Sequence, residues 1–275
     1  MPQPFLFFCF FLSACSAPEA PVIGLSMSYW EGKYYINRSY VDAVRENGGR
    51  VRLIPCTGVY HPSERGAEET DAVIFTGGRD YIPEWYGKSM HPSMTLMDIH
   101  RARYDSLLVR LALKSGKPVL GICAGEQLLA ITTGGKLFRD VPGHRNVQHM
   151  IYTAKGSRMA AWFGDSLMVN SWHHQCVDPE YLSPDFRVSA WTRDSTVEAI
   201  EYRGGQWITG TQFHPEQLPK AQRDAFSHGL YRKRADNAYS DLWQAEVKGT
   251  AICWNPEAHA SWSTPACPPD SSVSA

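Results

Sequence analysis

The stretch KPVLGICAGEQLLAIT, residues 117–132, decides the fold class of this chain. Its first six residues, 117–122, predict a short buried strand. The run from Gly125 to Thr132 predicts a helix, and Gly134-Gly135 directly after it is a typical stop signal. A strand, a tight turn and a helix are therefore expected in direct succession.

The same alternation of strands and helices continues on the N-terminal side of this stretch. The apolar pattern predicts strands at 22–25, 50–55 and 71–76, and helices at 40–47 and 97–115. Because such alternation favours βαβ units, we expect an α/β fold. Its centre would be a doubly wound, mostly parallel sheet flanked by helices.

The pattern changes after about residue 150. Short alternating runs at 186–191, 197–202 and 207–213 predict a small antiparallel addition to the same domain. A helix is expected from 217 to about 245. The domain would thus span residues 20–245, and residues 246–275, rich in Pro, Ser, Ala and Trp, predict an irregular tail.

Composition excludes several classes of protein. Of 275 residues, 43% are hydrophobic and 20% charged, so the chain can bury a core. Lys and Arg number 27 against 28 Asp and Glu, without a basic stripe, so no nucleic-acid partner is expected. Seven cysteines without a CxxC pair argue against a zinc ribbon or a disulfide framework.

The N-terminal residues 1–17 have the pattern of a targeting segment. The run FLFFCFFL at 5–12 is shorter than the about 20 residues that span a bilayer, but it suits a signal-peptide core. The sequence LSAC at 12–15 resembles the lipobox of bacterial lipoproteins, which predicts lipidation of Cys15, export and membrane attachment. Because no Lys or Arg precedes the apolar run, an apolar extension on a cytoplasmic protein is the alternative.

Cys123 is the candidate nucleophile. It lies between a predicted strand and a predicted helix, in a turn of small residues where larger side chains would collide. Unpaired N–H groups and the macrodipole at a helix N-terminus favour thiolate over thiol. The amide of Ala124 can then face a developing oxyanion. The alternative is a structural cysteine.

The sequence QFHPE at 212–216 supplies a candidate base and its orienting acid. Pro215 favours extended backbone at His214. Because side chains two positions apart in extended backbone point to the same side, Glu216 can hold the imidazole of His214. With Cys123 these residues would form a cysteine-type triad.

At this point the sequence resembles a known family. GICAGEQ at 121–127 and QFHPE at 212–216 look like the class I glutamine amidotransferases. FTGGRD at 75–80 and VNSWHHQ at 169–175 narrow the resemblance to the γ-glutamyl-γ-aminobutyrate hydrolase branch, the C26 peptidases. Further matching positions are Pro83, Tyr86-Gly87, Asp98, Arg101 and Asp105. The resemblance covers residues 20–218.

The resemblance implies roles for further residues. Cys123 would be the nucleophile, His214 the base and Glu216 the orienting acid. The remaining implied residues are Gly78 and Ala124 as oxyanion-hole amides and Gln127, Asn170, Ser171 and His173 as the group that holds the substrate.

No cofactor is implied by the resemblance. A metal pair at His173-His174 is not expected, because adjacent residues of a strand point apart. Glu126 departs from the family pattern, which is usually apolar or Met there. Its carboxylate would lie either near the pocket, where it would alter substrate preference, or on a solvated helix face.

The implied activity is hydrolysis of a small γ-glutamyl amide through a γ-glutamyl thioester, with release of glutamate. Two alternatives stay open: a glutaminase subunit that supplies ammonia to a synthase, and an anchored binding protein without turnover. The sequence leaves the leaving amine and the oligomeric state undetermined.

Overall fold

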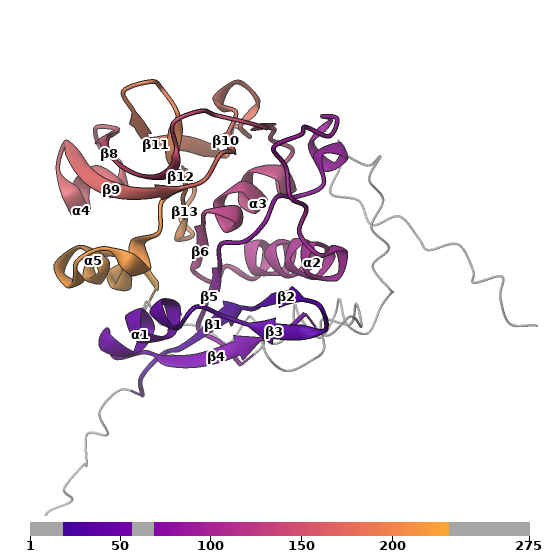
Figure 1. Ribbon diagram of the computed structural model, residues 1–275. Helices are drawn as coiled ribbons and strands as arrows, with labels where there is room; N and C mark the ends of the chain where they lie inside the picture. The colour runs from indigo at the N-terminus through magenta and orange to yellow at the C-terminus, as the bar shows by residue number, and fades with distance from the viewer. Residues whose placement is uncertain (1–18, 57–68, 231–275) are drawn as a thin grey trace, which may run out of the picture.

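The computed structural model describes residues 19–56 and 69–230 (Figure 1). The expected targeting segment at 1–17, the tail at 246–275 and the end of the helix expected through 245 lie outside the described residues. Within them, no helix is both long and apolar enough to cross a membrane.

The described residues are built around one nine-stranded sheet, in the order β4-β1-β5-β6-β13-β12-β11-β8-β9. Its first five strands run parallel to one another: β4 (Arg50–Ile54), β1 (Val22–Ser26), β5 (Ala72–Phe75), β6 (Val119–Ile122) and β13 (Ile208–Thr211). Every residue of β5, β6 and β13 is buried, as expected for parallel strands covered on both faces. The predicted α/β fold with a mostly parallel central sheet is confirmed.

The remaining four strands are antiparallel and extend the same sheet. They are β12 (Val197–Tyr202), β11 (Phe186–Thr192), β8 (Arg145–Thr153) and β9 (Ser166–Trp172). This part is larger than the small addition expected. The sequence did not predict β8, because most of its residues are exposed and its pattern shows no buried alternation. The expectation that 207–213 is antiparallel is half wrong: β13 is antiparallel to β12 but parallel to β6.

Helices cover both faces of the sheet (Figure 1). One apolar core lies on each face. The helices α2 (Ile99–Ser115) and α3 (Ala124–Thr132) pack into the first core. The helices α1 (Arg38–Glu46), α4 (Arg158–Phe163) and α5 (Lys220–Leu230) lie on the other face. Asn37 caps α1 and Asp98 caps α2, each accepting a backbone N–H with its side-chain oxygen.

Short elements complete the fold. A hairpin, β2 (Ser28–Trp30) and β3 (Lys33–Tyr35), follows β1, and β7 (Leu137–Phe138) pairs with β10 (Cys176–Val177). Three single-turn 3₁₀ helices are η1 (Pro83–Tyr86), η2 (Pro179–Tyr181) and η3 (Pro215–Gln217). The chain leaves β13 and enters η3, and the residues of η3 lie beside α1.

Candidate active site

Cys123 occupies the tight turn between β6 and α3. Its backbone has φ +53°, a conformation that residues other than glycine rarely adopt. Residues in such strained conformations are found most often at functional sites. Small neighbours are required here. A Cβ on Gly121 would lie 2.5 Å from the carbonyl oxygen of Gly125, and one on Gly125 would lie 2.2 Å from that of Phe75. The turn holds the cysteine at the N-terminus of α3, as the sequence predicts.

His214 and Glu216 meet beside this turn. The imidazole Nδ1 of His214 lies 2.8 Å from Oε1 of Glu216. Glu216 is buried, and His214 is mostly buried, with 13% of its side chain exposed. His214 has the extended backbone that Pro215 favours, but η3 begins directly afterwards. A 3₁₀ turn, and not a continued extended segment, therefore brings Glu216 under the imidazole.

Electrostatics favour a protonated His214. Burial by itself lowers the pKa of His214, but hydrogen bonding with Cys123 and with Glu216 outweighs it and raises this pKa to about 10. At neutral pH the imidazole is then an imidazolium between a sulfur and a carboxylate. This is the protonation state that can donate to a departing amine.

Tyr40 is a neighbour of the imidazole that the sequence did not indicate. Its hydroxyl lies 3.3 Å from Nδ1 of His214 and accepts a hydrogen bond of 3.0 Å from the amide of Gly77. Burial, and next to it the charge of Glu216, raises the pKa of Tyr40 well above its ordinary value. Tyr40 therefore stays neutral and links α1 to the loop after β5.

That loop contains Gly77 and Gly78 and lies against the candidate nucleophile. A Cβ on Gly77 would lie 3.5 Å from the Cβ of Cys123 and 2.8 Å from Cε1 of His214. The buried guanidinium of Arg101 holds the loop in place by donating hydrogen bonds to the carbonyl oxygens of Thr76 and Gly77. In the sequence, Arg101 matched the family pattern but had no assigned role. The structure shows that its guanidinium binds the backbone of the loop after β5.

The segment Asn170–His173 alternates between two sides of β9. Asn170 donates to the carbonyl oxygen of His214 and accepts from its amide, both at 2.9 Å, and the Trp172 ring lies 5.2 Å from the imidazole of His214. Ser171 and His173 face the other way. The Ser171 hydroxyl donates to the carbonyl oxygen of His144, and His173 Nε2 lies 3.3 Å from Glu198.

The four residues expected to hold substrate all have partners within the protein. The amide of Gln127 donates to the carbonyl oxygen of Gln175 and to Oε1 of Gln212, and Gln127 is buried. Of the four, only Asn170 has a hydrogen bond with His214, and Ser171 and His173 face His144 and Glu198. A direct role for them in substrate binding stays a prediction.

Two further expectations from the sequence can be compared with the structure. Glu126 is fully buried, so the interpretation as a solvated helix residue is wrong. Burial, and next to it the charge of Glu198, raises the pKa of Glu126 well above its ordinary value. His173 and His174 do point apart, since His174 Nε2 faces Asp80 and His173 faces Glu198.

A cavity of about 480 Å³ opens beside His214. It lies over the Gly77–Gly78 loop and reaches the β2–β3 hairpin, where Tyr29 and Tyr35 line it. Arg79 and Asp98 bring one positive and one negative side chain to its lining. A cavity of this size with these two charged side chains can take a small charged ligand next to the imidazole.

The mostly parallel sheet, the flanking helices and the turn at Cys123 define a class I glutamine amidotransferase fold. Solved structures share it. A chain from Thermoplasma acidophilum, described as part of a GMP synthase, aligns with TM-score 0.57 and 16% identity, over 83% of this chain and 96% of that one. A glutamine amidotransferase from Thermotoga maritima aligns with TM-score 0.54 and 22% identity, over 83% and 86%.

The chain belongs to the peptidase C26 family, whose sequence profile matches residues 21–216. Rv2859c of Mycobacterium tuberculosis, which its name describes as a glutamine amidotransferase, is 33% identical over 196 residues, 66% of this chain and 63% of that protein. Protein NtpR of Enterococcus hirae is 27% identical over 199 residues, 66% of this chain and 81% of that protein. This chain thus spans less than two thirds of the mycobacterial protein. The family supports a hydrolase.

Proposed function

We propose that this protein hydrolyses γ-glutamyl amides with Cys123, His214 and Glu216 as a catalytic triad. The observation behind the proposal is that His214 hydrogen-bonds with both Cys123 and Glu216, and that His214 and Glu216 line a cavity. Glu216 orients the imidazole through Nδ1, which leaves the other ring nitrogen, Nε2, to exchange a proton with the sulfur.

The proposed reaction has two halves. The Cys123 thiolate attacks the side-chain carbonyl carbon of the γ-glutamyl group, and the electron pair of the C=O bond moves to oxygen. As the tetrahedral intermediate collapses to a thioester, the C–N bond breaks and His214 gives its proton to the leaving amine. Water, deprotonated by His214, then attacks the thioester and releases glutamate and the thiolate.

The amides of Gly78 and Ala124 are proposed to stabilise the oxyanion. Ala124 is the first residue of α3, where an N–H group has no acceptor within the helix. Gly78 belongs to the loop that Arg101 holds beside Cys123. The charges of Arg79 and Asp98 in the cavity suit the α-carboxylate and α-ammonium groups of a γ-glutamyl substrate.

A second candidate is a glutaminase that passes ammonia to a synthase. The names of the similar proteins favour it, since several are described as amidotransferases or as parts of synthases. Both candidates use the same triad and the same thioester. They differ in whether the leaving group is a substituted amine or ammonia.

Glutamate release by the purified chain tests both. The substrates would be γ-glutamyl-γ-aminobutyrate, other γ-glutamyl amides and free glutamine, with ammonia measured in parallel. We expect release from the substituted amides, and a loss of at least about 10³-fold in Cys123→Ala. Ammonia from glutamine alone would favour the glutaminase. A folded protein without turnover of any of these substrates would contradict both candidates and favour a binding protein.

A further inference from the structure

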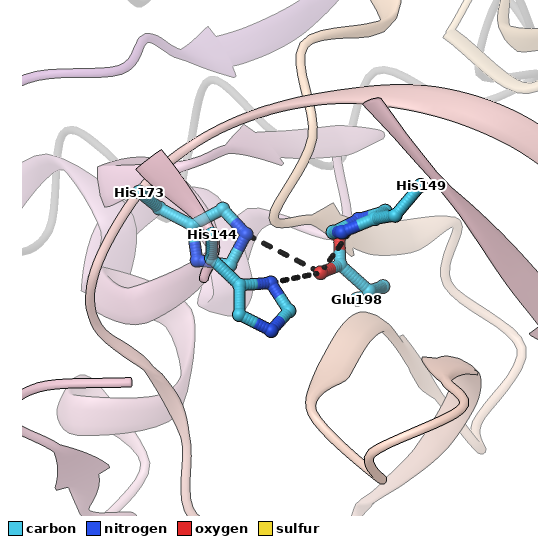
Figure 2. Close-up of side chains that lie close together, drawn as sticks. All are labelled: His144, His149, His173 and Glu198. Carbon is cyan, nitrogen blue, oxygen red and sulfur yellow. Dashed lines mark ion pairs between the residues drawn. The ribbon is translucent and has the colours of Figure 1, made fainter. Parts of the chain in front are cut away.

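Three imidazoles and one carboxylate meet in the antiparallel part of the sheet, apart from the triad residues (Figure 2). Oε1 of Glu198 lies 3.6 Å from Nδ1 of His144, 3.1 Å from Nε2 of His149 and 3.3 Å from Nε2 of His173. The four ligand atoms lie within 4.8 Å of one another. Glu198 is fully buried, and the side chains of His144 and His173 are at most 4% exposed.

A bulge in β8 makes this meeting possible. His144 and His149 are five positions apart, so in a regular strand they would point to opposite faces of the sheet. The register of β8 against β9 shifts between Arg145 and Val147, and Asn146 between them has φ +54°. One extra residue at such a bulge returns the two imidazoles to the same face.

In two of the histidines, the outer ring nitrogen, which points away from Glu198, already has a hydrogen-bond partner; the nitrogen that faces Glu198 is the inner one. Nε2 of His144 lies 3.0 Å from a carboxylate oxygen of Asp194, and Nδ1 of His173 lies 3.0 Å from the carbonyl oxygen of Gln175. Because these oxygens can only accept, each outer nitrogen bears the hydrogen. In the neutral imidazole the inner nitrogen then presents a lone pair.

These lone pairs face a carboxylate, which also offers only lone pairs. The inner nitrogens and both oxygens of Glu198 make no aligned hydrogen bond in the described part of the chain. Without a cation, His149 alone could donate to Glu198 as a neutral imidazole, because no contact fixes its hydrogen on the other nitrogen. The inner nitrogens of His144 and His173 could donate only if these buried imidazoles were protonated. A single divalent cation satisfies all four groups at once.

We propose that His144, His149, His173 and Glu198 bind one zinc ion. Three imidazole nitrogens and one carboxylate oxygen form a donor set that suits zinc. In a tetrahedral site with bonds of about 2.0 to 2.1 Å, neighbouring ligand atoms lie roughly 3.3 Å apart. The three distances from Glu198 Oε1 span this value.

The surroundings of the cluster match those of metal-binding histidines. A carboxylate behind His144 and a backbone carbonyl behind His173 are the outer partners that orient such ligands. Because the protein supplies all four ligands, the site is a structural one, without an open coordination position. It connects the start of β8, the end of β9 and β12, and so fixes the strand from which Asn170 holds His214.

Zinc content measures the proposal directly. The full chain, produced without a histidine tag, is stripped with a chelator, incubated with zinc chloride, desalted and analysed by inductively coupled plasma mass spectrometry. We expect one zinc per chain in the wild type and in the control His100→Ala, which removes an exposed imidazole from α2. His149→Ala removes the most accessible of the four ligands and should abolish stoichiometric uptake.

Two additional measurements keep the test independent of misfolding. Asp194→Asn changes a half-exposed side chain behind His144, and it should weaken zinc binding by roughly 10- to 100-fold in a chelator competition. Cobalt in place of zinc should give the intense visible absorption of a tetrahedral site in the wild type. No uptake by the wild type, equal uptake by folded His149→Ala, or a weak octahedral cobalt spectrum would each overturn the proposal.

Discussion

The parallel and antiparallel parts of the sheet build their polar sites in opposite ways. In the parallel part, one continuous stretch from β6 into α3 supplies the candidate nucleophile and the small residues around it. In the antiparallel part, the histidine cluster takes His149 from β8, Glu198 from β12, and His144 and His173 from the residues just before β8 and just after β9. A bulge in β8 sets the orientation of two of them. The turn that carries the candidate nucleophile is therefore local in sequence, whereas the histidine cluster depends on strand register.

The two parts are nevertheless coupled through one segment. Along β9 and just beyond it, Asn170 and Trp172 contact His214, while Ser171 and His173 turn toward the histidine cluster. Alternation of side chains in a strand thus joins the cluster to His214 of the proposed triad. The proposed triad does not depend on the parallel part alone.

The largest expected effect tests the candidate active site. Glu216→Gln should lower kcat/KM for a γ-glutamyl amide by about 10³-fold, because the imidazole loses the charge that orients it. Since Glu216 raises the pKa of His214, the variant should also lose activity at lower pH than the wild type. Wild-type kcat/KM should fall as pH rises through about 10, when the imidazolium loses its proton.

A pH profile of kcat/KM for both proteins measures these two effects. An alkaline limb at the same pH in both would contradict the role of Glu216. Lys220→Gln is a matched control, because this lysine pairs with Asp224 on the exposed side of α5, away from the imidazole. It should leave the profile unchanged.

The next prediction tests how strongly the fold depends on the small residues around Cys123. In Gly125→Ala the new methyl group would meet the carbonyl oxygen of Phe75 at 2.2 Å, and neither backbone can move freely. We expect the free energy of unfolding to fall by about 3 kcal/mol or more. Urea unfolding measures it. In the control Gly205→Ala the added carbon meets nothing within 4 Å, so its stability should match the wild type.

The smallest effect tests the coupling between the two parts. Asn170→Ala removes two hydrogen bonds to the backbone of His214. The amide and the carbonyl oxygen of His214 then lose these partners. We expect kcat to fall about tenfold, with little change in KM, while Met168→Ala, exposed on the same strand, should behave as the wild type. A raised KM with unchanged kcat would instead assign Asn170 to substrate binding.

Much of the parallel part could be predicted from the sequence. The strands at β1, β4, β5 and β6 and the turn at Cys123 follow from apolar runs and small residues that act over short distances. The proximity of His214 and Glu216 was also predictable, because they lie two positions apart. Tyr40 was not, since its contact with His214 joins residues 174 positions apart.

The antiparallel part was less predictable for a physical reason. β8 exposes most of its residues, so no buried alternation marks it as a strand. The sequence directed attention to His173 and His174 as neighbours, whereas the partners of His173 are His144 and His149 across the sheet. An irregular register, which arises only when the strands pair, decides which imidazoles meet.

β13 has a consequence for how the domain can move. It is buried throughout, and it pairs with β6 on one side and with β12 on the other. Any opening that separated the two parts of the sheet would have to break one of these ladders in the middle of the core. Amide hydrogens along β13 should therefore exchange with deuterated solvent only when the whole domain unfolds, and both sites are gained or lost in one cooperative event.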